Sequence, residues 1–400
     1  MKILVINCGS SSVKYQLLEM PEGKVIAKGL FEKIGEEISF LHHKSVKGDL
    51  EFKQKVANHE EGLNFIMNIL IDKEKGVISS INEIRGVGHR VVHGGEGFTK
   101  SVLITDEVIK KTEEHIDLAP LHNPANLMGI KASKKILPDV VQVAAFDTAF
   151  HYTIPKQAYL YAIPYEFYEK YKIRRYGFHG TSHRYVARRL AKILNKNKED
   201  LNIITCHLGN GCSITAVKEG KSVDTSMGLT PLEGVVMGTR SGDIDPAIIF
   251  YLIEKGYSSE ELNNILNKKS GLLGISGISN DMRNLLQAKD KGDKKAELAI
   301  DIFCYHLKKY IGSYMAVLGR TDAIIFTAGI GENVPYIRKK SLSGMEELGI
   351  EIDEKKNKEV KHIEAEISGE ASKVKVWVIP TNEEIRMAFD AYEIAKETKK

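Results

Sequence analysis

The chain has 400 residues, more than a single hydrophobic core usually serves, so its length favours two domains. Its hydrophobic share of 42% and charged share of 28% are ordinary for a globular protein and exclude long disordered stretches. The formal charge of +4 arises from 57 basic and 53 acidic residues mixed along the chain, so charge gives no argument for a nucleic-acid or anionic-membrane partner.

The first residues, MKILVIN, combine a basic residue with a short apolar run, as signal peptides do. The run is too short for a signal peptide and ends in a polar turn without a small-residue cleavage site, so we predict a first β-strand. No segment approaches the roughly 18 apolar residues that span a bilayer. The four cysteines form no CxxC pair, which favours buried, reduced thiols. We therefore expect a cytoplasmic protein.

The N-terminal pattern recurs about halfway along the chain. Residues 2–17 align without gaps with residues 202–217, which places Gly9 on Gly209. Each copy has the pattern of a strand, a turn of small residues and a second strand, and a third strand follows a glycine turn in both. The sequence therefore predicts an internal duplication.

Two further echoes follow in the same order. Residues 87–96 (VGHRVVHGGE) resemble residues 324–333 (IIFTAGIGEN), a strand that runs into a glycine-rich turn. Residues 141–148 (VQVAAFDT) resemble residues 374–381 (VKVWVIPT), a strand that ends in polar residues. Three echoes in one order support the duplication.

Helical spacing of apolar residues fills the segments between these strands. Asn123-Pro124 and Asp245-Pro246 have the pattern of a helix cap followed by the first turn. The predicted helices are 59–71, 124–137, 183–194, 246–254, 296–317 and 383–396. Strand and helix thus alternate, which predicts two α/β domains with mixed sheets that face each other across a cleft.

The glycine turns favour one kind of phosphate site over others. A Walker loop or a dinucleotide fingerprint joins a strand to a helix, whereas the first glycine turn of each half joins a strand to a strand. Asn7–Ser12 with Lys14, and His207–Gly211, are the two strand-to-strand turns. Their backbone N–H groups are suited to holding nucleotide phosphates. Gly329–Asn333 lies before a predicted helix, where an anion is also favoured.

Two arginines and a histidine lie near glycines. Arg90 is on an apolar strand and Arg240 is on a glycine-rich loop, where either forms a structural salt bridge or binds a carboxylate or phosphate. His179 lies four residues before His183, a spacing that suits zinc only on a helix, and Gly180 argues against one there. A histidine that donates to a transferring phosphoryl group fits His179 better, with a structural histidine as the alternative.

Acidic residues follow two of the predicted strands. Asp147 ends the strand at 140–146, and Glu383 and Glu384 follow the strand at 374–380. Carboxylates at strand ends are natural positions for Mg²⁺ or for acid–base chemistry. Thr381 to Glu384 has the pattern of a capping box, which gives Glu384 a structural task and leaves Glu383 as the better candidate for holding Mg²⁺ through water.

Together these motifs closely resemble the acetate kinase family, within the superfamily of actin, hexokinase and heat-shock ATPases. The resemblance extends from residue 1 to about residue 390. Its motifs are INCGSSSVKY, GHRVVHGGE, LHNPANL, FDTAFH, RRYGFHGTSH, HLGNGCS, DTSMGLTPLEGVVMGTRSGDIDPA, TAGIGEN and IPTNEE.

The resemblance implies two duplicated actin-like (ribonuclease H-like) domains with mixed five-stranded sheets flanked by helices, and an active site in the interdomain cleft. It implies an N-terminal domain of residues 1–150 plus 385–400 and a nucleotide-binding domain of residues 151–384. It also implies ATP + acetate ⇌ ADP + acetyl phosphate by a phosphotransferase with a carboxyl acceptor. Mg²⁺, for which Mn²⁺ substitutes, and a homodimer are part of the family pattern.

The resemblance also assigns roles to individual residues. It implies that Asn7 and Glu383 hold Mg²⁺, that His179 and Arg240 stabilise the transition state, and that Asp147 transfers a proton. It implies that Arg90 binds the acceptor, beside an apolar wall of Val92, Leu121, Phe178 and Pro231. The residues that it implies for the nucleotide are Lys14, His207, Leu208, Gly209, Asn210, Gly211, Asp281, Met282, Arg283, Gly329, Ile330, Gly331, Glu332 and Asn333.

Simple chemistry modifies the last of these roles. A simple carboxylic acid with a pKa of about 4–5 is already ionised at neutral pH, so no proton has to be removed from acetate. We therefore expect Asp147 to orient a Mg²⁺-bound water or an arginine. The alternatives are a propionate or butyrate kinase, an actin-like ATPase without an acceptor, and a non-catalytic nucleotide-binding module.

Overall fold

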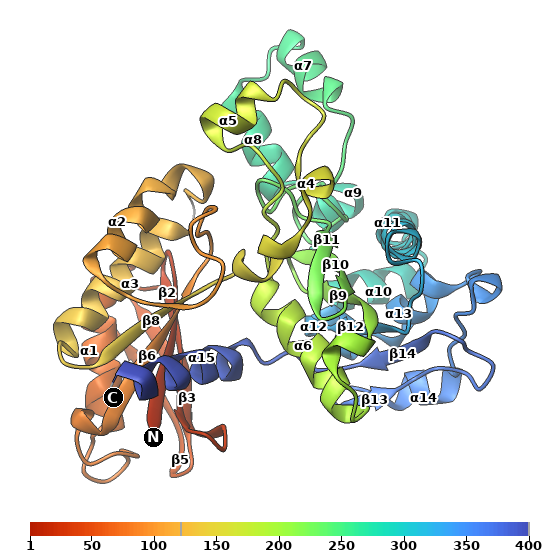
Figure 1. Cartoon of the computed structure of the whole chain (residues 1–400). Coiled ribbons are helices and arrows are strands. Elements are labelled where there is room, and N and C mark those ends of the chain that lie inside the picture. Colours follow the sequence, from red (N-terminus) through yellow and green to blue (C-terminus); the bar gives the residue numbers. More distant parts are fainter. Residues whose placement is uncertain (121, 399–400) are drawn as a thin grey trace. The chain divides into compact units, whose positions relative to one another are not determined.

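The computed structural model describes residues 1–120 and 122–398 of the chain, and these fold into two compact units (Figure 1). The first unit is Met1–Ala149 with Asn382–Lys400, and the second is Phe150–Thr381. Each unit contains one sheet with helices against it, which confirms the predicted α/β class. Glu383 and Glu384 belong to the first unit, although the expected boundary assigned them to the second.

The first unit has an eight-stranded sheet in the order β5-β4-β3-β2-β1-β6-β8-β7. β1 pairs with β2 antiparallel and with β6 parallel, and β6 pairs with β8 parallel. The strands are β1 (Lys2–Gly9), β2 (Ser12–Glu19), β3 (Lys24–Glu32), β4 (Ser39–Ser45), β5 (Gly48–Gln54), β6 (Ile84–Val91), β7 (Val102–Leu103) and β8 (Val141–Phe146).

The second unit has a six-stranded sheet in the order β11-β10-β9-β12-β14-β13. β9 pairs with β10 antiparallel and with β12 parallel, and β12 pairs with β14 parallel. The strands are β9 (Asn202–Leu208), β10 (Cys212–Lys218), β11 (Lys221–Thr225), β12 (Ala323–Thr327), β13 (Ala365–Glu366) and β14 (Lys375–Val378).

Five strands in each sheet share one order and one set of directions. They are β3-β2-β1-β6-β8 in the first unit and β11-β10-β9-β12-β14 in the second, and they contain all three sequence echoes. The expected five strands describe this common part only. β4, β5 and β7 widen the first sheet and β13 widens the second, and these four strands lie outside the repeat. β4 and β5 contain many polar residues between their apolar ones.

The six predicted helices are all present, with ends that differ by up to three residues. The helices are α1 (His59–Leu70), α2 (Asp106–Glu114), α3 (Asn123–Ile136), α4 (Lys156–Tyr159), α5 (Glu166–Tyr171), α6 (Gly180–Ile193), α7 (Ala247–Glu254), α8 (Ser259–Lys268), α9 (Gly271–Ser276), α10 (Met282–Asp290), α11 (Lys294–Leu318), α12 (Ala328–Asn333), α13 (Pro335–Leu342), α14 (Glu354–Glu359) and α15 (Glu383–Thr398). None of those in the described ranges combines the length and apolar character of a membrane-spanning helix.

One helix start differs from the prediction in a way that bears on the site. α3 begins at Asn123 itself, and its N-cap residue, His122, makes no capping hydrogen bond through its side chain. The predicted role of Asn123 as the cap is therefore wrong. Its side chain instead bonds the backbone of His93, 30 residues earlier in the chain.

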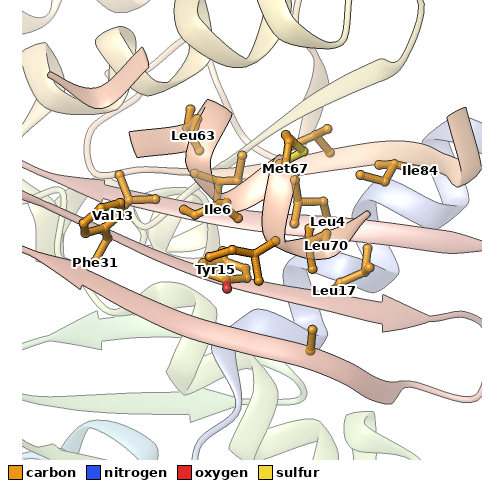
Figure 2. Packing of buried hydrophobic residues seen from close by; sticks show 14 of the residues in the cluster. Leu4, Ile6, Val13, Tyr15, Leu17, Phe31, Leu63, Met67, Leu70 and Ile84 are labelled. Atoms are coloured by element: carbon orange, nitrogen blue, oxygen red, sulfur yellow. The ribbon is translucent and has the colours of Figure 1, made fainter. Parts of the chain in front are cut away.

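β1 is buried on both faces because its side chains alternate between two helical layers. Leu4 and Ile6 pack in one cluster against α1 and α3, and Ile3 and Val5 pack in another against α15. Figure 2 shows the first cluster, in which Leu63 and other α1 side chains cover the sheet. Burial on both faces and pairing on both edges fix the position at which β1 ends.

Candidate functional site

Arg90 and Asp147 form a bidentate ion pair at the carboxyl ends of two neighbouring parallel strands. Arg90 lies on β6 and Asp147 directly follows β8, whose last residue pairs with Val91. Arg90 Nη2 donates to Asp147 Oδ2 at 2.6 Å, and Arg90 Nε donates to both carboxylate oxygens at 3.1 and 3.2 Å. This pair fixes one edge of the guanidinium, and Nη1 makes no hydrogen bond with the described residues.

The charge on Arg90 is secured by its neighbours. Burial would lower the pKa of the guanidinium, but the carboxylates of Asp147 and Glu383 outweigh it and raise that pKa. The Asp147 side chain is only 1% exposed, so its charge depends on the arginine for compensation. Arg90 is thus a permanent, oriented cation with one nitrogen available to an anion.

The two glutamates at the start of α15 differ in their partners. Glu384 forms an ion pair with Lys14, and Asn382 caps α15 by accepting from the backbone N–H of Ile385 at 3.0 Å. The predicted capping box from Thr381 is therefore wrong, because the helix starts one residue later than that pattern requires. Glu383 makes no ion pair or side-chain hydrogen bond with the described residues.

Glu383 is suited to a divalent cation. Burial, then Asp147 and Glu384, raise its pKa to about 7, although Arg90 and Lys14 act in the opposite direction. A carboxylate that is crowded by other carboxylates and bonded to nothing fits a hard cation with oxygen ligands. Asn7, on β1 opposite Lys14, adds an amide oxygen in the same unit. Oxygen donors of these two kinds fit Mg²⁺, which would need water or phosphate oxygens to complete its ligands.

Val92 occupies a buried position just beyond β6 in the first unit. Its backbone N–H donates to Asn126 Oδ1 at 3.0 Å. Of the other residues expected in the acceptor wall, Leu121 lies outside the described residues. Phe178 is buried and Pro231 is half-buried, and both belong to the second unit.

In the second unit, His179 stands at a strained turn. Its φ of 56° is in the left-handed region, which a histidine seldom adopts, and α6 begins at the next residue. Its ring stacks on that of His207, with 4.1 Å between the ring centroids. Ser213 Oγ lies 2.9 Å from His179 Nδ1 and 2.7 Å from His183 Nε2. These contacts hold the imidazole in one orientation.

The histidine behind His179 has a structural role. Burial, reinforced by His151 and His207, lowers the pKa of His183 well below its usual value, so its ring is neutral. Its Nδ1 lies 2.6 Å from Thr205 Oγ1. A metal held jointly by His179 and His183 is disfavoured by this geometry, because His183 directs both of its nitrogens at hydroxyl groups.

Arg240 approaches His179 at the glycine turn between β9 and β10. A Cβ atom at Gly211 would lie 3.3 Å from Arg240 Nη1 and 3.6 Å from His179 Nε2, so both groups converge on this turn, and a larger residue there would crowd the arginine. Arg240 Nη1 donates to the carbonyl of Pro231 at 3.3 Å. Burial lowers the pKa of Arg240, and Arg240 forms no ion pair with any described residue. A desolvated cation without an anion is a strong anion site.

A cavity of about 750 Å³ opens beside this turn, a volume that suits a nucleotide. Eight of the fourteen expected nucleotide residues line it: Gly209, Asn210, Asp281, Met282, Arg283, Gly329, Ile330 and Asn333. Asn210 connects the cavity to the arginine loop, because its Oδ1 accepts from Asn280 and its carbonyl accepts from the N–H of Gly238, each at 2.9 Å.

The remaining expected nucleotide residues lie elsewhere. Glu332 is buried, and its carboxylate contacts His362 at 2.8 Å and accepts from the N–H of Thr381 at 3.1 Å. Gly331 offers its carbonyl to the buried Arg338 at 2.8 Å. The other residues that do not line the cavity are Lys14, His207, Leu208 and Gly211. Glu332 and Gly331 anchor α12 to its surroundings and do not line the cavity.

Similarity to known proteins agrees with this geometry. The model of the Acetokinase family matches residues 2–389. The chain belongs to the acetokinase family. An acetate kinase of Brachyspira hyodysenteriae is 60% identical over 399 residues, covering 99% of this chain and 100% of that protein. The structure of Porphyromonas gingivalis acetate kinase is 49% identical with a TM-score of 0.94, and that of a propionate kinase from Francisella tularensis is 46% identical with a TM-score of 0.92; each covers 98% of this chain and 99% of its own.

Sequence reasoning missed several residues of the site. Asn280, Lys361 and His362 line the cavity, and Ser213 orients His179. Asn280 directly precedes Asp281, so its position next to an expected nucleotide residue could have identified it. Lys361 and His362 belong to a polar loop with no pattern of its own, and the left-handed φ of 55° at His362 is visible only in the fold.

Proposed function

We propose that the chain acts as an acetate kinase, transferring the γ-phosphoryl group of ATP reversibly to acetate to give ADP and acetyl phosphate. Membership of the acetokinase family and 60% identity to an acetate kinase support the reaction class. The observation that carries the proposal is the convergence of Arg240 and His179 on the Gly211 turn, beside a cavity of nucleotide size. A desolvated arginine and an oriented imidazole at one point suit a phosphoryl group in transfer.

The transfer is a direct in-line displacement. A carboxylate oxygen of acetate forms a bond to the γ-phosphorus while the bond to the β,γ-bridging oxygen breaks, and its electron pair leaves with ADP. Arg240 and His179 donate to the equatorial oxygens, where charge is spread in the transition state. Each such contact contributes on the order of 3 kcal/mol. Arg90 holds the acetate carboxylate through the edge that Asp147 leaves available.

Mg²⁺, or Mn²⁺ in its place, would be held by Glu383 and Asn7 through water and would neutralise charge on the phosphates. Asp147 orients Arg90 in this account and removes no proton, since acetate is ionised at neutral pH. The acceptor groups belong to the first unit and the phosphoryl-binding groups to the second, so we propose that both units act on one pair of substrates. ATP as a substrate also supports a cytoplasmic location.

The first prediction concerns the product and the acceptor. With Mg-ATP and hydroxylamine as a trap, acetate yields acyl hydroxamate, and propionate reacts about 10- to 200-fold less efficiently, because one extra methylene must fit against Val92. The measurement is kcat/KM for acetate, propionate and butyrate. Hydrolysis of ATP without any trapped acyl phosphate would instead support an actin-like ATPase, and a preference for propionate would support a propionate kinase.

The second prediction concerns Asp147. Asn in its place keeps the shape but removes the charge that holds Arg90, so the Asp147→Asn variant loses about 10- to 100-fold in kcat/KM for acetate. The KM for ATP changes little, because the cavity lies in the other unit. Kinetics at varied acetate and varied ATP separate the two effects. Near-normal turnover at low acetate would contradict the positioning role.

The third prediction concerns assembly as a homodimer. α7 has the sequence AIIFYLIE and no buried residue, and Phe250 and Tyr251 on it are 67% and 58% exposed. Such a helix suits a matching apolar face, and a second copy of the chain supplies one. Sedimentation should give a dimer for the chain and a monomer for Phe250→Glu. Val46→Glu, at a position 65% exposed in the first unit, is the control and should remain dimeric. A monomeric parent chain would contradict the proposal.

A further inference from the structure

Two buried asparagines on α3 meet the backbone that follows β6. Asn123 Oδ1 accepts from the N–H of His93 at 3.1 Å, and Asn123 Nδ2 donates to the carbonyl of the same residue at 3.0 Å. One helical turn later, Asn126 Oδ1 accepts from the N–H of Val92 at 3.0 Å, and its Nδ2 donates to the carbonyl of Cys8 at 2.9 Å. Both residues are 3% exposed or less.

These amides take the place of a strand where the sheet ends. The ladder between β1 and β6 ends at the pair Ile6–His89, and the ladder between β6 and β8 ends at the pair Val91–Phe146. Beyond these pairs, no strand of the described ranges pairs with Val92 or His93 on the β1 side. A primary amide has a carbonyl acceptor and N–H donors, as a peptide group has, so Asn123 and Asn126 continue the pattern of hydrogen bonds.

The connection made by Asn126 joins two parts of the site. Cys8 adjoins Asn7 on β1, and Val92 is two residues beyond Arg90 on the chain that leaves β6. The same amide therefore fixes the spacing between the end of β1 and Val92, a residue of the expected apolar wall. No pairing of β1 with residues 92–93 secures that spacing otherwise, within the described residues.

We propose that Asn126, supported by Asn123, is a positioning residue for acceptor selectivity that fixes Val92 against the acceptor's methyl group. This inference rests on the proposed function, because it assumes that Val92 faces the acceptor. Selectivity between acetate and propionate depends on how firmly the wall is held, because a wall that yields leaves more room for one more methylene. The amide therefore controls chain length without touching the substrate.

Three variants test the proposal. Asn126→Ala removes both hydrogen bonds. Asn126→Asp keeps the acceptor for the N–H of Val92 but cannot donate to the carbonyl of Cys8 when ionised. Ser133→Ala is the matched control, because Ser133 is a buried polar residue on the same helix whose hydroxyl donates to Gln142 at 3.0 Å, away from residue 92.

The main readout is the ratio of kcat/KM for acetate to kcat/KM for propionate. In Asn126→Ala this ratio falls by about threefold or more, while the KM for ATP stays within about twofold of the parent value. Asn126→Asp retains more of the selectivity than Asn126→Ala, and Ser133→Ala retains all of it. Loss of stability alone lowers activity towards both acceptors equally and does not change the ratio.

Hydrogen exchange provides a readout that does not depend on activity. Amides of the segment 90–94 exchange faster in Asn126→Ala than in the parent chain or in Ser133→Ala, because the N–H of Val92 loses its acceptor. An unchanged ratio together with unchanged exchange in Asn126→Ala would overturn the inference. If the parent chain made no acyl phosphate, the proposed function would fail, whereas normal selectivity in the parent and in Asn126→Ala would count against the positioning role alone.

Discussion

The central strand of each sheet is covered by helices or buried side chains on both faces and paired on both edges, and this confinement determines where the functional groups lie. β1 is held between β2 and β6, and β9 is held between β10 and β12. The glycine turns that follow them sit at fixed positions because the strands before them cannot shift without disturbing two layers of packing. In the second unit this places Gly211 where Arg240 and His179 meet.

Arg90 in the first unit and Arg240 in the second carry their charges in different ways. Arg90 is paired with a buried carboxylate that fixes its orientation and raises its pKa. Its guanidinium is therefore preorganised to bind a second carboxylate. Arg240 is half-buried beside a carbonyl and a thioether and has no acidic partner among the described residues. An approaching phosphoryl oxygen would supply the negative charge that Arg240 lacks. This difference suits one arginine to binding an acceptor and the other to stabilising transferred charge.

Much of the fold followed from local patterns, because strands buried on two faces and long amphipathic helices leave clear periodicities. The duplication was visible for the same reason, since β1 and β9 occupy equivalent positions in their sheets and are both buried. Side-chain tasks were harder to predict. Asn123 has the sequence pattern of a helix cap and serves His93 instead, and Glu384 has the pattern of a capping box and pairs with Lys14. In both cases a partner distant in sequence competes with the local one, and local spacing contains no information about it.

The central claim is that the terminal phosphate of the nucleotide reaches the point where Arg240 and His179 converge. A crystal structure with a non-hydrolysable ATP analogue, Mg²⁺ and acetate tests this most directly. The account predicts a nucleotide in the cavity lined by Asn210 and Ile330, with γ-phosphate oxygens within hydrogen-bonding distance of Arg240 and His179 Nε2. A nucleotide bound in another place, or a γ-phosphate that contacts neither side chain, would contradict it.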